Sequence, residues 1–124
     1  MISLSKEQVF ALHAKLMGAT AGSVTVINEA GLESALLCPL QIFMGKELYP
    51  SSIHKIARTA YGIIKNHPFL DGNKRAATYV MLILLKLNGI DAKLSQEDVV
   101  YVGEAIANGT MTDRELVAYI LARC

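Results

Sequence analysis

Several residue types that would point to particular classes of protein are scarce in this sequence. Its 124 residues include no tryptophan, three prolines and two cysteines, Cys38 and Cys124. The cysteines lack a metal-ligand spacing such as C-x-x-C, and a chain of this length buries enough surface to fold without disulfides or metals. We therefore expect two reduced thiols in a cytoplasmic protein.

Strong charge and long apolar runs are also missing. The formal net charge is +1, so we expect no direct binding to nucleic acid and no attraction to an anionic membrane. The longest apolar run, residues 80–85, is far shorter than a bilayer span, and residues 1–6 lack the apolar core of a signal peptide. Any binding of phosphate must therefore come from a local site.

Helix signals, in contrast, repeat along the chain. Residues that favour helix N-caps precede apolar residues at helical spacing in five places: Ser5, Asn28, Ser51 or Ser52, Ser95 and Thr112. Ser5 and Thr112 are each followed three residues later by Gln or Glu, which is the capping-box pattern. Strand alternation is almost absent. The sequence predicts an all-α fold, with residues 1–124 forming a single compact domain of about six helices.

One predicted helix, residues 73–88, differs from the others. From residue 76 to residue 85 it is apolar on nearly every side, so we expect it at the centre of the domain with other helices around it. Pro68 ends the helix before it, and Gly89 is a suitable left-handed stop. Residues 18–27 are typical of a loop with room for an extended piece at 24–27, and residues 40–50 are less regular.

The start of this helix gathers groups that bind anions. Gly72 leaves the backbone accessible where the free N–H groups of a helix start cluster, at the positive end of the helix dipole. Asn73 adds an amide donor, and Lys74 and Arg75 add two cations in the first turn. Cations here oppose the dipole and destabilise the helix unless an anion lies between them. We expect a polyphosphate in that place.

Two titratable residues precede this cluster. Asp71 can hold Mg²⁺ against phosphate oxygens or cap the helix. His67 lies on the other side of the turn, and an imidazole can accept a proton from a hydroxyl near neutral pH, which suits general-base work. Phe69 is expected to point into the core and anchor the loop. Each residue alone has an ordinary structural explanation, but their order and density favour a site.

Residues 67–75, His-Pro-Phe-Leu-Asp-Gly-Asn-Lys-Arg, resemble the H-x-F-x-D-G-N-K-R motif of the Fic/Doc superfamily, and the Doc (death-on-curing) branch most closely. Similar pieces at residues 3–13, 32–36, 49–50 and 88–89 extend the resemblance over nearly the whole chain. It implies an α-helical, nucleotide-dependent transferase that uses ATP and Mg²⁺.

The resemblance also implies a role for each residue of the motif. His67 is the catalytic base, and Asp71 is a second catalytic residue, as a Mg²⁺ ligand or a helper to the base. The nucleotide's phosphates are held by the residues that follow, which are Gly72, Asn73, Lys74 and Arg75.

Two positions separate the two branches of the superfamily. Fic proteins mostly transfer AMP from ATP to a target hydroxyl, whereas Doc proteins are understood as kinases that phosphorylate a translation elongation factor. Lys74 stands where the Fic motif has its second glycine, and Thr78 where it has its second arginine. Lys74 fills space and adds charge, and Thr78 removes a ligand for the far phosphates, so a nucleotide could present its γ-phosphate to His67. We favour phosphoryl transfer, with AMP transfer or a catalytically silent binding module as the alternatives.

Doc proteins are toxins of toxin–antitoxin pairs, so regulation is part of what the resemblance implies. The inhibitory pattern [ST]-x-x-x-E-[GN] of some Fic-type proteins fails here at Gln8 and at Ala30. We therefore expect a separate antitoxin protein as a partner. His13 and His54 have no partner at metal spacing and are expected to be partly buried structural histidines.

Overall fold

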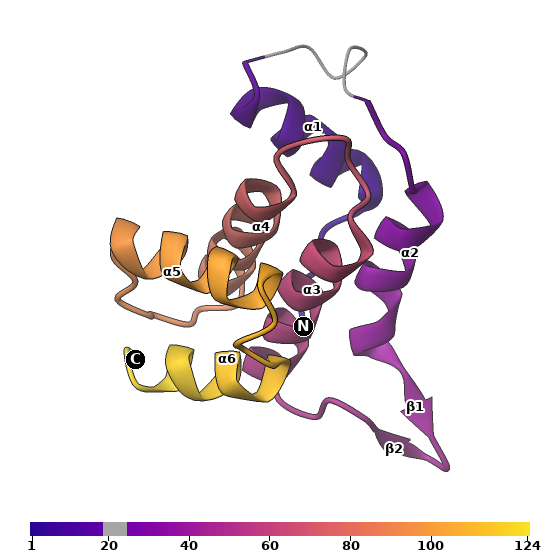
Figure 1. The fold of residues 1–124 in the computed structure, drawn as a ribbon. Helices are drawn as coiled ribbons and strands as arrows, with labels where there is room; N and C mark the ends of the chain where they lie inside the picture. Colours follow the sequence, from indigo (N-terminus) through magenta and orange to yellow (C-terminus); the bar gives the residue numbers. More distant parts are fainter. Residues whose placement is uncertain (19–24) are drawn as a thin grey trace.

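The computed structural model describes residues 1–18 and 25–124 (Figure 1). The elements follow in the order α1 (Lys6–Leu16), α2 (Glu29–Leu37), the 3₁₀ helix η2 (Cys38–Leu40), β1 (Ile42–Phe43), β2 (Lys46–Glu47), α3 (Ser52–Asn66), α4 (Asn73–Leu87), α5 (Gln96–Ala107) and α6 (Asp113–Leu121). The predicted helical fold is confirmed, with six α-helices among the described residues and one small hairpin that the sequence did not predict.

The predicted N-caps account for where most helices begin. Ser5, Ser95 and Thr112 each accept from the backbone N–H three residues later, and the side chain at that position bonds back, so α1, α5 and α6 start in complete capping boxes. Asn28 and Ser51 accept from the third residue of α2 and α3. Each cap satisfies a donor that the helix itself leaves free.

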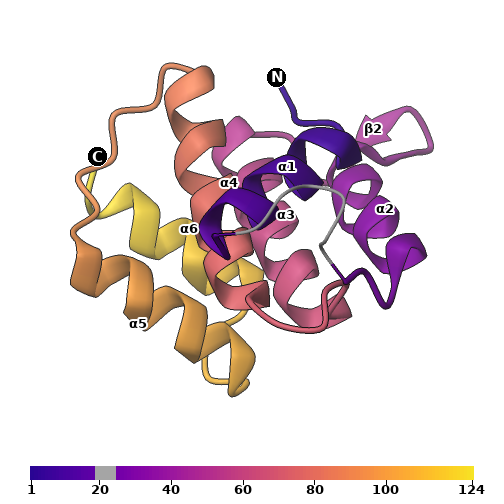
Figure 2. The same ribbon diagram turned by 90° about the horizontal axis from the view of Figure 1, so that it is seen from above.

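Two neighbouring helices, α3 and α4, form the interior (Figure 2). As predicted, α4 lies inside, against α1, α3 and α5; α3 beside it contacts α2, α4, α5 and α6. Their fully buried residues include Ile56, Ala60, Ile63, Ala77, Val80 and Met81. The apolar character of α4 is thus explained by packing, and among the described residues no helix is long and apolar enough to cross a membrane.

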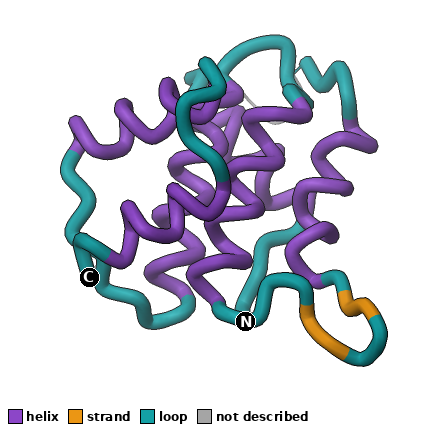
Figure 3. The backbone as a smooth tube through the Cα atoms, turned by 60° about the horizontal axis from the view of Figure 1, so that its bottom comes forward, coloured by secondary structure: helices purple, strands orange, loops and turns teal. Residues whose placement is uncertain are grey.

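The predicted irregular stretch 40–50 contains a tiny antiparallel hairpin, in which Ile42 pairs with Glu47 and Phe43 with Lys46. Met44 and Gly45 form its turn, both with positive φ, as a type I′ hairpin turn requires. All four strand residues are exposed, so there was no buried face to produce an alternating pattern. Figure 3 shows the hairpin projecting from the helical body.

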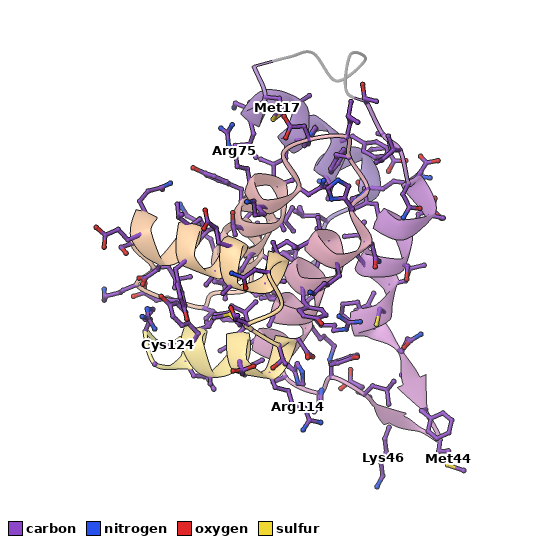
Figure 4. All side chains as sticks on the ribbon, viewed as in Figure 1. Met17, Met44, Lys46, Arg75, Arg114 and Cys124 are labelled. Atoms are coloured by element: carbon purple, nitrogen blue, oxygen red, sulfur yellow. The ribbon has the colours of Figure 1, made fainter. Side chains whose placement is uncertain are left out.

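The loop of residues 67–72 joins the end of α3 to the start of α4. It lies at the opposite end of the molecule from the hairpin: in Figure 4, Arg75 in the first turn of α4 is near Met17, far from Met44 and Lys46 at the hairpin. The end of α3 and the start of α4 therefore lie at one edge of the domain, and residues 67–75 lie there.

Candidate active site

The motif leaves α3 through an uncommon backbone conformation. His67 follows the last residue of α3 and takes the left-handed conformation, with φ 49° and ψ 58°. That region costs a non-glycine residue about 1–2 kcal/mol, and glycine or asparagine is the usual choice after a helix. A histidine kept there against this cost indicates a function for its side chain, and the residue is solvent-exposed.

Phe69 anchors the loop, as predicted. Its side chain is fully buried, and the ring of His13 from α1 stacks on it with centroids 3.8 Å apart and planes at 3°. Phe10 meets it edge-on at 6.2 Å. The loop is thereby fixed to α1, which lies 50 to 60 residues earlier in the chain.

His13 was predicted to be a partly buried structural residue, and its position makes it the main support of the loop. Its Nε2 donates to the backbone carbonyl of Asp71 at 2.6 Å, and the residue is buried. Beside it, a Cβ built on Gly72 would lie 2.7 Å from Met17 Sδ and 3.1 Å from His13 Nε2. Glycine is therefore favoured at this position, because φ 78° strains other residues and the stacked His13 ring leaves little room for a side chain. Nothing in the sequence around His13 indicated this contact, because it forms only in the folded chain.

The opposite side of the loop is held by the segment before α2. Val26 forms an isolated antiparallel bridge with Phe69, and the backbone N–H groups of Ile27 and Asn28 both donate to the Pro68 carbonyl, at 2.8 and 3.1 Å. The extended piece predicted at 24–27 is confirmed at Val26, while residue 24 lies outside the described residues. Pinned on both sides, the loop presents its groups in one arrangement.

The start of α4 has no side-chain cap. Gly72 occupies the cap position with φ 78°, and the first helical bond runs from Ala76 N to Gly72 O at 2.9 Å. Within the part of the chain that the structure describes, the N–H groups of the three residues between them donate to no acceptor. Lys74 and Arg75 are exposed and form no ion pair with any described residue. Free donors and two free cations therefore share one helix end, which is an arrangement that binds anions.

The Asn73 side chain has partners within the loop. The sequence predicts that its amide donates to phosphate, and that stays a prediction; in the structure the side chain is buried. Its Oδ1 accepts from Phe69 N at 3.0 Å, and its Nδ2 donates to Phe69 O at 2.9 Å and lies 3.1 Å from His67 Nδ1. The residue's backbone N–H remains free for an anion, while its side chain holds the loop and orients the histidine.

This contact also determines where His67 carries its proton. An amide nitrogen only donates, so the ring accepts at Nδ1, and the neutral imidazole carries its proton on Nε2. In this arrangement Nε2 is a hydrogen-bond donor toward solvent. To accept a proton at Nε2, the neutral ring must carry its own proton on Nδ1. It can then no longer accept from Asn73 Nδ2, so acting as a base requires the ring to give up this contact.

Asp71 is exposed at the end of the loop. One carboxylate oxygen, Oδ1, accepts from Gly72 N at 2.8 Å, and Oδ2 forms no hydrogen bond with a described residue. No group of three or more candidate metal ligands lies among the described residues. A single carboxylate oxygen beside a phosphate site nevertheless suits Mg²⁺, which is commonly held by one or two carboxylates together with substrate phosphates.

A surface hollow of about 440 Å³ brings these groups together. We call it the first hollow; it is lined by Ile64, Lys65, His67, Leu70, Asp71, Gly72, Asn73, Lys74, Arg75 and Ala107. Every predicted site residue thus lines one cavity. Thr78 does not reach it: its hydroxyl donates to the carbonyls of Lys74 and Arg75 at 2.9 and 3.2 Å and offers nothing to a ligand.

Fold and site together define a helical domain with an anion site at the start of a central helix, beside an exposed histidine and an exposed carboxylate. Residues 3–85, more than half of the chain, match the family described as the Fic/DOC family. The chain belongs to this family. No curated protein matches the chain.

Proteins of this family are generally transferases that use nucleotide substrates and act on protein targets. The matched residues contain α1, α2, α3, most of α4 and the whole motif, whereas α5 and α6 lie beyond them.

Proposed function

We propose that this protein is a Doc-type kinase that transfers the γ-phosphoryl group of ATP to a hydroxyl of a protein target. The observation that carries the proposal is the bare start of α4, where free N–H groups and the unpaired cations Lys74 and Arg75 lie beside His67 in one hollow. Such a site does most of its work by neutralising the charge of the transferred group.

The phosphates are bound by the backbone N–H groups of the first turn of α4 and by the side chains of Lys74 and Arg75. The target's hydroxyl oxygen attacks the γ-phosphorus, the bond from that phosphorus to the β–γ bridging oxygen breaks, and ADP leaves with the bonding electron pair. The hydroxyl proton passes to Nε2 of His67. Asp71 would hold Mg²⁺ through its free oxygen, and the ion would supply further neutralisation of phosphate charge.

The resting contact between His67 and Asn73 is compatible with this base role. Giving up one such hydrogen bond costs about 0.5–1.5 kcal/mol, which lowers the population of the active ring state by roughly tenfold at most. General-base catalysis contributes about 10²–10⁴-fold. The gain exceeds the cost, so Asn73 serves as a positioning residue that His67 leaves during turnover.

Thr78 supports transfer of the γ-phosphoryl group over transfer of AMP. Its hydroxyl is bonded to the helix backbone and its residue is buried, so it provides no ligand for the far phosphates. Cationic groups are concentrated instead at Lys74 and Arg75, beside His67. This distribution favours the end of the nucleotide with the most charge, the γ-phosphate, at the catalytic residues.

The biological setting follows from the Doc resemblance and is part of the proposal. The target is a protein of the translation elongation factor class, and the activity is that of a toxin restrained by a separate antitoxin. Residues 1–124 act as a single Fic/Doc-like domain. AMP transfer and a catalytically silent binding module remain the competing functions.

Incubation with a cell lysate and ATP labelled at either the α- or the γ-phosphate separates these functions. We expect one lysate protein to retain the γ label and none to retain the α label. Label retained only from the α position would contradict the kinase proposal. Expression of His67→Ala, with His54→Ala as the matched control, tests the silent module, since growth arrest that persists in His67→Ala would favour binding without catalysis.

A further inference from the structure

One face of α3 carries two cations outside the motif. Arg58, Tyr61 and Lys65 follow one another at three- and four-residue spacing, which places them on one face of the helix. Arg58 and Tyr61 are half-buried and Lys65 is exposed, whereas most of the positions between them are buried against other helices. We call these three residues the cationic face.

The positive charge of the cationic face is not matched by the fold. Neither Arg58 nor Lys65 forms an ion pair with a described residue, and residues 19–24 contain no Asp or Glu. Nη1 of Arg58 is buried and has no hydrogen-bond partner in the part of the chain that the structure describes. Buried polar groups are normally paired, so this guanidinium is an exception that needs an explanation.

The basic residues at the start of α3 show the contrast. Lys55 Nζ lies 3.1 Å from a carboxylate oxygen of Glu47 in the hairpin, and His54 Nε2 lies 3.1 Å from one of Asp113 in α6. These groups already have acidic partners within the protein. The cationic face therefore begins only at Arg58, one turn further along the helix.

The Tyr61 ring lies beside both cations. Arg58 Cζ is 4.9 Å from the centre of the ring, and Lys65 Nζ is 5.7 Å from it. A cation–π contact of this kind contributes about 0.5–1 kcal/mol at an exposed site. The neutral ring orients the two side chains but leaves their charge available to a partner.

The cationic face is continuous with the candidate active site. Lys65 lines the first hollow, and His67 follows the last residue of α3. Arg58 comes nine residues before His67, which is about 13 Å along the helix axis, and it lines no part of the hollow. The face thus leads away from the hollow along α3, and a molecule bound on it would reach the hollow at Lys65.

We propose that the cationic face docks an acidic segment of the protein target and so brings the target's hydroxyl to His67. This inference rests on the proposed function and adds the kind of segment that the enzyme selects. Arg58 and Lys65 are about 10 Å apart along the axis of α3, a distance that about three residues of extended chain span. Two carboxylates at that spacing can pair with both cations, and the hydroxyl follows the acid nearest Lys65.

A protein segment suits the face better than other anions. In the proposed function the nucleotide's phosphates occupy the start of α4, away from Arg58. The net charge of +1 gives no broad attraction for nucleic acid, so the attraction is local to these two cations. Bound ATP would repel an acidic segment from the first hollow itself. The acids of a target are therefore held best beside the hollow, where Arg58 and Lys65 lie.

The test measures transfer of the γ label from MgATP to the lysate protein by the whole chain, at several lysate concentrations. Arg58→Glu should lower kcat/KM for this transfer by about tenfold, and added salt should slow the wild type more than the variant. Binding of MgATP, measured by calorimetry, should change by less than about twofold, because Arg58 lies outside the first hollow. Arg58→Lys keeps the charge and should retain most of the rate. Thermal melts show whether each variant is folded.

Lys65→Glu and Lys86→Glu form a matched pair. Both lysines are exposed and lie in the last turn of a central helix, so the two changes alter the net charge and the helix dipole in the same way. Only Lys65 belongs to the cationic face. Lys65→Glu should slow labelling of the target, and Lys86→Glu should leave the rate unchanged.

Three results would overturn the inference while the proposed function stands. The first is a folded Arg58→Glu that labels the target at the wild-type rate, and the second is an equal loss of rate in Lys65→Glu and Lys86→Glu. The third is normal labelling by Arg58→Glu together with loss of neutralisation by the antitoxin, since the face would then bind the antitoxin. A wild-type chain that transfers no γ label overturns the proposed function itself, and this inference with it.

Discussion

The starts of α1, α5 and α6 differ from the start of α4 in each feature that governs the stability of a helix end. The first three carry complete capping boxes and acidic residues in the first turn, so one backbone donor of each first turn bonds to the cap side chain and negative charge balances the positive end of the dipole. α4 begins at an uncapped glycine with two cations and no acid in its first turn. The protein caps the starts of α1, α5 and α6 and leaves uncapped the start of α4, which lies in the candidate site.

The loop before α4 shows the same contrast with ordinary loops. His67 has a left-handed backbone conformation, which is costly for a residue other than glycine. The buried side-chain amide of Asn73 contacts its ring and orients it. Contacts from α1 and from the segment before α2 then hold the loop in place. The backbone strain at His67 costs free energy of folding, and the packing around the loop offsets that cost. Preorganised binding sites commonly store strain in this way.

The largest effect is expected when His67, which follows α3, is replaced. His67→Asn keeps a residue that tolerates the left-handed conformation, so stability should be unchanged or higher by up to about 1 kcal/mol. Phosphoryl transfer should fall by at least about 10²-fold because the base is lost. Denaturant unfolding and labelled-ATP assays measure the two quantities; His54→Asn, whose parent bonds Asp113 far from the motif, should keep full activity. If His67→Asn and His54→Asn lost activity equally, the result would contradict a specific role of His67 as the base.

Making α4 begin like the other helices should separate stability from binding. Lys74→Glu places an acid in the first turn, which should raise the free energy of unfolding by about 1 kcal/mol and abolish measurable binding of tripolyphosphate. Lys86→Glu, at the other end of the same helix, is the control: it removes a cation that the dipole favours and should destabilise slightly without affecting binding. A Lys74→Glu variant that is less stable than wild type would show that the helix start is not strained by its cations.

Removing a cap tests the other side of the comparison. Thr112→Ala deletes the acceptor for Glu115 N at the start of α6 and should cost about 1 kcal/mol of stability. Because no residue of α6 lines the first hollow, the affinity for MgATP should be unchanged once the fraction of folded protein is accounted for. A change in that affinity would mean that α6 is coupled to the site.

The smallest effect concerns the capping box of α5. The hydrogen bond from Tyr119 holds the pKa of Asp98 at about 2, below its ordinary value of 3.8. Since the folded-state pKa is lowered, the stabilisation is present above about pH 4 and is lost as the pH falls toward 2. Thermal melts across this range should show a shallower acid decline for Asp98→Asn than for the wild type, and parallel curves would contradict the assignment.

Local features of the fold could be predicted from the sequence, because a cap and the apolar repeat behind it lie within a few residues of each other. Ser5, Ser95 and Thr112 marked their helices correctly for that reason. The support of His13 for the loop could not be predicted, since it joins residues 58 positions apart. The sequence also could not show that the Asn73 side chain bonds to the backbone of Phe69, or that Ala107 of α5 lines the first hollow, because both depend on how the loop and the helices pack.

The most direct test of the contrast between the helix starts is a backbone amide titration by NMR with MgATP. We predict large chemical-shift changes for the amides of Asn73, Lys74 and Arg75, and none above the background for the first turns of α1 and α6. Equal changes at these three helix starts, or none at α4, would contradict the conclusion that the uncapped start of α4 binds the nucleotide's phosphates.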